Sequence, residues 1–401
     1  MPDFALYRPL LAEPRFRNQA LAGFFAQLTQ GGTVLALILL VQQARGSLGL
    51  AGAVAAGFVV GAAIARPIQG RLIDTRGPRR VLIVIAVAQT VALLALVPIV
   101  KSDLPGIVPV LMSLIAGLGL PPVSQVQRLV WAGLAGDDRT TVYSVIGMIQ
   151  EGSILAGPLL VGVLAGVASP SAALVVVAVV SGAGLFWLGL LVPDLRARSE
   201  EDGHGGGLLR EPAVRFVLLL EFLFGVALSG IEIGVPALAT SEGHPSTAGF
   251  LLAVTSVGGI AGGLLYGGRR WTSRPRTRLA LLLALSTIGF AVLVPVDSLI
   301  LAGGILIVLG MVLTPVLTTL ILLLDLASPR FLAEAFGWSS TSSAIGTGGG
   351  AALVGVLAQH HGAGPAFAIG AAGCALALVV ALGAGGLPRL ASRPVPGKVP
   401  E

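Results

Sequence analysis

The sequence predicts an all-α integral membrane protein whose twelve transmembrane helices form two pseudo-symmetric six-helix bundles. Hydrophobic residues make up 55% of the chain and charged residues 11%, with a mean hydropathy of +0.93. Soluble domains carry about 25% charged residues. A chain of 401 residues with so little charge must turn much of its apolar surface toward lipid. Long apolar runs and an internal repeat supply the rest of the prediction.

The apolar runs define the expected helices, because a bilayer core requires about 20 apolar residues per span. They lie at 18–41, 48–69, 81–101, 104–131, 141–168, 170–192, 213–240, 246–268, 278–296, 299–326, 334–358 and 364–387. A polar, Gly-rich interruption at 193–212 cannot form a core. We therefore expect an N-terminal bundle at 1–192, a cytoplasmic linker at 193–212, a C-terminal bundle at 213–388 and a cytoplasmic tail at 389–401.

The distribution of basic residues sets the expected orientation. With both termini in the cytoplasm, Arg45 and Lys101 lie on the outer side and the other 23 of the 25 basic residues lie on the inner side. Cytoplasmic loops carry such an excess of Lys and Arg. We expect a multi-pass protein of the inner or plasma membrane. The net charge of +6 then reflects topology, and no nucleic-acid partner is expected.

Short sequence matches relate the two halves. The tetrapeptide Gly-Val-Leu-Ala at 162–165 recurs at 355–358, a shift of 193 residues. The same shift maps Gly157 on Gly350 and Gly70 on Gly263. Residues 263–270 then resemble a degenerate second copy of the charged segment at 70–80, without its aspartate. Parallel halves related by an axis along the membrane normal, with a binding site near the midplane, are a known transporter design.

The charged segment at 70–80 is the most informative motif. Its glycines predict a tight hairpin between the second and third spans. It resembles the signature loop of major facilitator superfamily (MFS) transporters, G-x-L-x-D-R-x-G-R-R. The matching residues are Gly70, Leu72, Asp74, Gly77 and Arg79. Thr75 and Pro78 stand where that family usually has basic residues.

The resemblance implies a secondary transporter in which two bundles rock about a central cavity. The loop would latch the cytoplasmic side, with Asp74 near the N-terminus of span eleven, where the helix dipole favours an anion. The residues assigned to this gating region are Gly70, Asp74, Arg76, Gly77, Arg79, Arg80 and Arg128. Arg128 has two interpretations: it extends to the membrane surface, or it pairs with an acid in the inner cavity.

A second resemblance lies in the fifth span. Its Gly152, Gly157, Pro158 and Gly162 resemble the Gly-Pro motif of drug and metabolite antiporters in the same superfamily. Ser153 and Val161 depart from that motif. The alternative is a glycine-lined packing face with a proline kink.

Carboxylates inside the spans are the candidates for proton coupling. Ionisable groups at bilayer depth are expensive and usually functional. Glu151 lies about 15 Å into its span, at 1.5 Å per residue. Glu221 and Glu232 are three turns apart and are expected on one helix face, although Glu232 could equally be an outer-interface residue. Structural hydrogen bonding is the alternative for Glu151.

Neutral polar residues complete the expected substrate cavity. Gln27, Gln30 and Thr33 share one face of the first span and would join Glu151 and Glu221, or else serve as interhelical hydrogen bonds. Asp325 is expected to pair with the nearby Arg330. His360 and His361 lack the further ligands of a metal site, so no metal or cofactor is expected. The single cysteine, Cys374, excludes an intrachain disulfide.

The function expected from these patterns is transport and not enzymatic catalysis. We expect a monomer that exports a small amphipathic drug or metabolite in exchange for protons. One alternative is uptake of a sugar or amino acid by symport or facilitation. Another, from a different class, is a membrane sensor or scaffold that does not transport.

Overall fold

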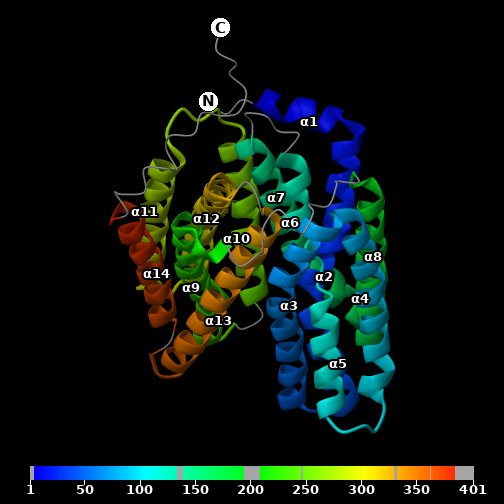
Figure 1. The fold of residues 1–401 in the computed structure, drawn as a ribbon. Helices are drawn as coiled ribbons and strands as arrows, with labels where there is room; N and C mark the ends of the chain where they lie inside the picture. Colours follow the sequence, from blue (N-terminus) through cyan, green and yellow to red (C-terminus); the bar gives the residue numbers. More distant parts are fainter. Residues whose placement is uncertain are drawn as a thin grey trace. The chain divides into compact units, whose positions relative to one another are not determined.

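The computed structural model describes residues 4–132, 139–193, 208–244, 247–328, 332–361 and 363–383. Within these ranges the regular structure is helical throughout, with no strand. Eleven helices in this part of the chain are long and apolar enough to cross a membrane. The predicted all-α membrane fold is therefore confirmed (Figure 1).

The helices follow the expected spans closely. In the first half they are α1 (Arg8–Ala12), α2 (Pro14–Arg45), α3 (Leu48–Arg76), α4 (Pro78–Lys101), α5 (Ile107–Leu118), α6 (Val123–Ala132), α7 (Arg139–Val167) and α8 (Pro170–Leu191). In the second half they are α9 (Pro212–Ser241), α10 (Thr247–Gly267), α11 (Pro275–Leu293), α12 (Leu299–Ala327), α13 (Leu332–His361) and α14 (Gly364–Gly383). Two short 3₁₀ turns, η1 (Phe4–Tyr7) and η3 (Leu208–Arg210), precede α1 and α9.

The expected fourth span is broken into α5 and α6. Pro121 and Pro122 lie between the two helices, and proline lacks the N–H that a continuous helix needs. The side-chain amide of Gln69, on α3, donates to the carbonyl oxygen of Leu118 at 2.8 Å. This bond satisfies one of the carbonyl groups left free where α5 ends.

The segment at 70–80 differs from its prediction, because most of it is helix. α3 continues to Arg76 and α4 begins at Pro78, so the connection is one residue, Gly77. Its φ of 82° lies in a region that favours glycine. Thr75 fits the last turn because its hydroxyl donates to the carbonyl oxygen of Arg71 at 2.9 Å. The predicted helix boundaries at 69 and 81 were therefore wrong.

Contacts along the chain define two compact units. One comprises residues 8–130 and 149–204, and the other comprises 1–7, 131–148 and 205–401. The first contains α2 packed on α8 and α3 packed on α5; the second contains α9 packed on α13 and α10 packed on α12. α7 is divided, with its first ten residues, 139–148, in the second unit. The predicted bundle boundaries at 192 and 213 stay a prediction.

Glycine permits close helix crossings inside both units. A Cβ on Gly61 of α3 would lie 2.2 Å from the carbonyl oxygen of Leu114, and one on Gly262 of α10 would lie 2.2 Å from that of Met311. Each crossing brings two helices of the same half into backbone contact. The match of Gly70 with Gly263 in the sequence repeat stays a prediction.

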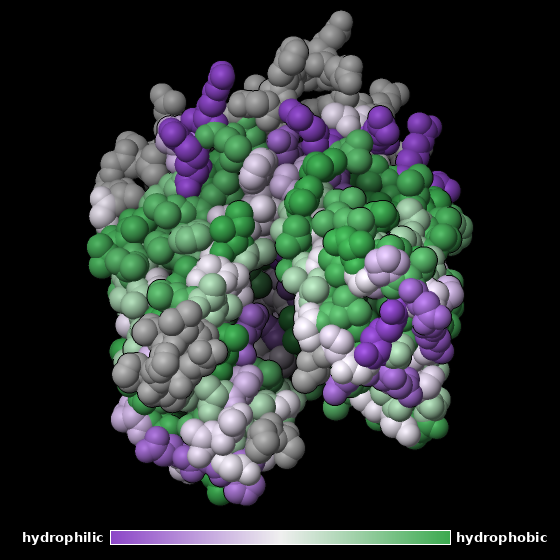
Figure 2. Space-filling view, turned by 90° about the horizontal axis from the view of Figure 1, so that it is seen from below, coloured by the Kyte–Doolittle hydropathy of each residue, from purple (hydrophilic) through white to green (hydrophobic). Residues whose placement is uncertain are grey.

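Large apolar side chains remain exposed along the helices, as lipid contact requires. On α4, Val84, Val87 and Val91 are more than half exposed and repeat at helical spacing. On α12, Ile300 is 91% exposed. Apolar side chains cover large areas of the face shown in Figure 2, and hydrophilic side chains gather in separate groups.

Candidate functional site

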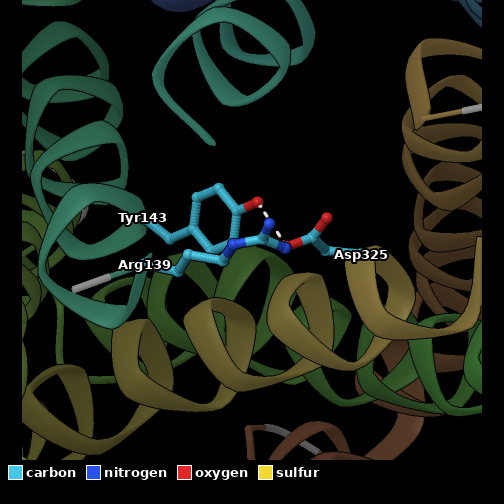
Figure 3. A network of polar contacts seen from close by, with 3 residues as sticks. All are labelled: Arg139, Tyr143 and Asp325. Atoms are coloured by element: carbon cyan, nitrogen blue, oxygen red, sulfur yellow. Dashed lines mark hydrogen bonds and ion pairs between the residues drawn. The ribbon is translucent and has the colours of Figure 1, made fainter. Parts of the chain in front are cut away.

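The first residues of α7 form an ion pair with the end of α12 (Figure 3). Arg139 Nη1 lies 2.5 Å from Asp325 Oδ2, and the Tyr143 hydroxyl donates to the same oxygen at 2.9 Å. Arg139 and Tyr143 are four residues apart, so both side chains lie on one face of α7. The Asp325 side chain is 2% exposed and that of Arg139 is 35% exposed. A nearly buried carboxylate is thus held by a cation and a hydroxyl from another helix.

The local partner expected for Asp325 was Arg330, five residues away, which lies outside the described residues. Among the described residues, the carboxylate binds two that precede it by more than 180 positions. Such a pair joins segments that are distant in the sequence, so the spacing of the residues cannot predict it.

Further contacts hold the same ten residues of α7 on α10 and α12. The Thr141 hydroxyl donates to the carbonyl oxygen of Gly267, at the end of α10, at 2.6 Å. A Cβ on Gly147 would lie 3.2 Å from Cγ2 of Thr314 on α12. This part of α7 therefore packs against two helices from the second half of the sequence.

The remaining part of α7 packs against α2. A Cβ on Gly157 would lie 2.7 Å from the backbone nitrogen of Gly32, which leaves no room for a side chain. The Ser153 hydroxyl donates to the carbonyl oxygen of Phe24 at 3.3 Å. By contrast, a Cβ on Gly162 would meet nothing within 4 Å. The packing-face interpretation of the Gly-Pro segment thus has local support at Gly157 and none at Gly162.

A network of side-chain amides lies between α2, α6 and α7. Gln27 donates to Gln127 Oε1 at 3.4 Å, and Gln127 donates to the carbonyl oxygen of Gln19 at 3.2 Å. The Ser124 hydroxyl lies 3.4 Å from Gln27 Oε1 and 3.5 Å from Gln150 Oε1. Gln27 and Gln127 are almost completely buried. The network is neutral and links three helices.

The structure separates the three polar residues expected on α2. Gln27 belongs to the amide network and Thr33 is buried, whereas Gln30 is exposed. Their common role in a substrate cavity stays a prediction. Gln19, Gln127 and Ser124 were not assigned to the site from sequence, although the polar composition of 124–128 was a signal that could have identified two of them.

The three membrane carboxylates occupy different environments. Glu221 is 1% exposed, and its Oε1 accepts a hydrogen bond from the Ser339 hydroxyl of α13 at 3.0 Å. Glu232 is exposed although it lies on the same helix, and Glu151 is half-buried. Ser339 begins a run of hydroxyl-bearing residues, 339–343, on α13.

The residues of the signature segment differ in exposure. Asp74 is half-buried, and Arg76, Arg79 and Arg80 are exposed, while Gly70 is buried inside α3. Arg128 is 5% exposed, and its role in gating stays a prediction. In the described part of the chain, no three His, Cys, Asp or Glu residues are grouped to hold a metal ion.

Comparison with solved structures shows the same fold in known transporters. The human organic anion transporter MFSD10 (TETRAN) matches with a TM-score of 0.73 and 17% identity, over 92% of this chain and all of the other. A bacterial homologue of the iron transporter ferroportin in its outward-facing state gives 0.72 and 17%, over 94% and 98%. The MFS transporter FucP in its outward conformation gives 0.66 and 16%, over 91% and 98%.

Family comparison agrees with the fold. No curated protein matches the sequence significantly. The family model described as Major Facilitator Superfamily matches residues 20–331, which is most of the chain. Together with the signature segment, the membrane helices and the transporter fold, this match shows that the chain belongs to the major facilitator superfamily of transporters.

Proposed function

We propose that this chain is a proton-coupled transporter that exports a small amphipathic compound by alternating access. One observation carries the proposal: a single helix, α7, bears both the membrane carboxylate Glu151 and the residues that hold α12, Arg139 and Tyr143. Glu151 follows Arg139 by twelve residues, about 18 Å along the helix at 1.5 Å per residue. A change of charge on α7 can therefore affect its inner contacts.

The proposed cycle uses the protonation of carboxylates within the membrane. A charged carboxylate at bilayer depth is unfavourable, so binding a proton changes which surroundings Glu151 prefers. We assign Glu151 the main coupling role and Glu221 a supporting role through its bond with Ser339. Opening of the inner side then requires separation of Asp325 from Arg139. Substrate and proton each shift the same equilibrium only through different affinities for its two states.

The proposed substrate follows from the neutral character of the amide network. Gln30 is exposed on α2 beside the buried amide network of Gln27, and it offers hydrogen bonds without a fixed charge, next to mostly apolar helices. Such surroundings suit a compound with an apolar body and a few polar groups. Export as the direction rests on the resemblance of 152–162 to the antiporter Gly-Pro motif. We place the protein in the inner or plasma membrane with both termini in the cytoplasm.

Proton-driven dye uptake into inside-out membrane vesicles tests the proposal, because export from the cytoplasm carries the dye into their lumen. A panel of fluorescent amphipathic dyes is screened with the unmodified protein, and a positive dye is then used with Glu151→Gln. We expect Glu151→Gln to abolish dye uptake driven by the proton gradient and to retain dye exchange without a gradient. Glu242→Gln, which changes an exposed carboxylate at the end of α9, is the matched control. Unchanged gradient-driven transport in Glu151→Gln would refute the coupling assignment.

A further inference from the structure

The N-terminal segment before α1 is bound to the end of α10. The Tyr7 hydroxyl donates to the carbonyl oxygen of Leu264 at 2.8 Å and lies 3.3 Å from that of Gly263. Leu6 is 6% exposed and Tyr7 is 7% exposed. Terminal residues are usually poorly ordered unless something binds them. Tyr7 is buried by its contact with a helix more than 250 residues away in the sequence.

Tyr7 is one of several side chains that satisfy the end of α10. The last four carbonyl groups of a helix have no partner within the helix. Here Tyr266 accepts from the indole of Trp271 at 2.9 Å, and Gly267 accepts from Thr141 at 2.6 Å. Leu264 accepts from the backbone N–H of Gly268 at 3.0 Å, and Tyr7 adds a second hydrogen bond to the same oxygen. Trp271 lies just beyond α10, but Tyr7 and Thr141 come from the first half of the sequence. The end of α10 is therefore completed by distant segments.

Gly267 shows how closely these segments meet. A Cβ added there would lie 2.6 Å from the Tyr7 hydroxyl oxygen and 2.6 Å from Cβ of Ser144 on α7. Ser144 is itself completely buried. Tyr7 and the inner end of α7 thus share one small site on α10, and glycine is required where they meet. Anything that separates α7 from α10 uncovers the surface that Tyr7 binds.

The chemistry of Tyr7 suits a neutral contact that persists at physiological pH. Burial raises the pKa of Tyr7 to about 12, so its hydroxyl keeps the proton that it donates. The next residues, Arg8–Ala12, form α1 and belong to the other compact unit. The chain therefore passes from one unit to the other directly after Tyr7.

From these contacts we infer that residues 4–7 form a strap that holds α10 beside the inner end of α7 and stabilises the inward-closed state. The inference rests on the proposed alternating-access function and adds a second fastening, independent of the Arg139–Asp325 pair. Removing the Tyr7 hydroxyl weakens the closed state by one hydrogen bond, which corresponds to about a fivefold increase in the open population.

The test uses a buried thiol as a reporter of inner opening. Cys374 is replaced by alanine and Ser144 by cysteine, so the only thiol lies under Tyr7 and Gly267. The rate of its reaction with a water-soluble thiol reagent then follows the open population, and no substrate is needed. We expect Tyr7→Phe to raise this rate about fivefold. Thr287→Val is the matched control, because among the described residues that hydroxyl bonds to Leu283 of its own helix, α11, at 2.8 Å.

The possible outcomes distinguish the strap at Tyr7 from the Arg139–Asp325 ion pair. If Asp325→Asn accelerates labelling and Tyr7→Phe does not, the strap is refuted, whereas the ion pair keeps its role in closing the inner side. If neither variant changes the rate, the role that the proposed function gives to the ion pair is refuted as well. If Tyr7→Phe and Thr287→Val accelerate labelling equally, the effect is general loosening, which also refutes the strap.

Discussion

The two parts of α7 differ in what they pack against and in how they are held. Residues 139–148 meet α10 and α12 through an ion pair and hydroxyl groups, which can separate and rehydrate, and through a close side-chain contact of Ser144 with Gly267. Residues beyond 149 meet α2 through glycine, with backbone against backbone at Gly157. Polar contacts to a partly exposed arginine can be exchanged for contacts with water, whereas a tight helix crossing cannot. In the proposed mechanism, the first part of α7 is therefore the releasable attachment and the second part is the permanent one.

The same difference explains why the boundary between the two compact units falls within α7. A transporter that alternates between two states needs elements whose packing changes and elements whose packing persists. The cut between Met148 and Ile149 lies just before Glu151. In the proposed mechanism, the coupling carboxylate therefore stands next to the boundary between the two kinds of attachment.

The largest expected effect is at the permanent attachment. Gly157→Leu places a side chain where even a Cβ would lie 2.7 Å from the Gly32 backbone. Overpacking of this kind costs about 3 kcal/mol, and we expect a clearly lower unfolding temperature of the purified protein in detergent. Gly162→Leu, on the same helix with nothing within 4 Å of its Cβ, is the control and should leave that temperature unchanged. Equal losses in both variants would contradict a tight α2–α7 crossing.

The next effect is at the releasable attachment. Asp325→Asn removes the charge that faces Arg139, and the partial exposure of Arg139 limits the penalty to about 2 kcal/mol. We expect a roughly thirtyfold faster reaction of the Ser144→Cys reporter, with little change in unfolding temperature. Asp297→Asn, an exposed carboxylate before α12, is the control. An unchanged labelling rate would show that the pair does not hold the closed state.

Tyr143→Phe should produce a smaller change in the same direction. It deletes a hydrogen bond to a charged acceptor, 2.9 Å long, and keeps the aromatic ring. Such bonds contribute about 1.5 kcal/mol, so we expect roughly tenfold faster labelling of the reporter. In the double variant, Tyr143→Phe should add little to the labelling rate of Asp325→Asn, because both substitutions act on one carboxylate. Fully additive effects would mean that Tyr143 acts elsewhere.

The smallest effects compare one hydroxyl in each part of α7. Thr141→Val removes a 2.6 Å bond to Gly267, and we expect about fivefold faster labelling. Ser153→Ala loses a longer 3.3 Å contact with Phe24 and should leave labelling unchanged. If Ser153→Ala accelerated labelling as much as Thr141→Val, the two attachments would not differ in kind.

Much of the fold was predictable because lipid imposes strict rules on sequence. Apolar runs of about 20 residues located nearly every helix, and the break at Pro121 and Pro122 is the main exception. The same runs could not show that α3 continues to Arg76, since polar residues at a helix end look like a loop. One glycine with positive φ, Gly77, makes the turn that the motif suggested for the whole segment.

The candidate site was less predictable because its contacts join distant segments. The carboxylates and amides could be selected by type and depth, but the partners Ser339, Gln127 and Arg139 could not be derived from spacing. Nothing in the composition near Tyr7 distinguishes it from an ordinary terminal residue. The proposed coupling, gating and cavity roles remain predictions of the mechanism.

Spin-label distance measurements on two pairs of sites test the central claim most directly. Labels at Thr140 and Leu326 report the inner end of α7 against α12, and labels at Gln43 and Val167 report its outer end against α2; the last three sites are exposed. The cysteine-free background carries Cys374→Ala. We predict that Asp325→Asn lengthens the Thr140–Leu326 distance and leaves the Gln43–Val167 distance unchanged. An unchanged inner distance, or equal changes in both pairs, would contradict a helix with one releasable and one permanent attachment.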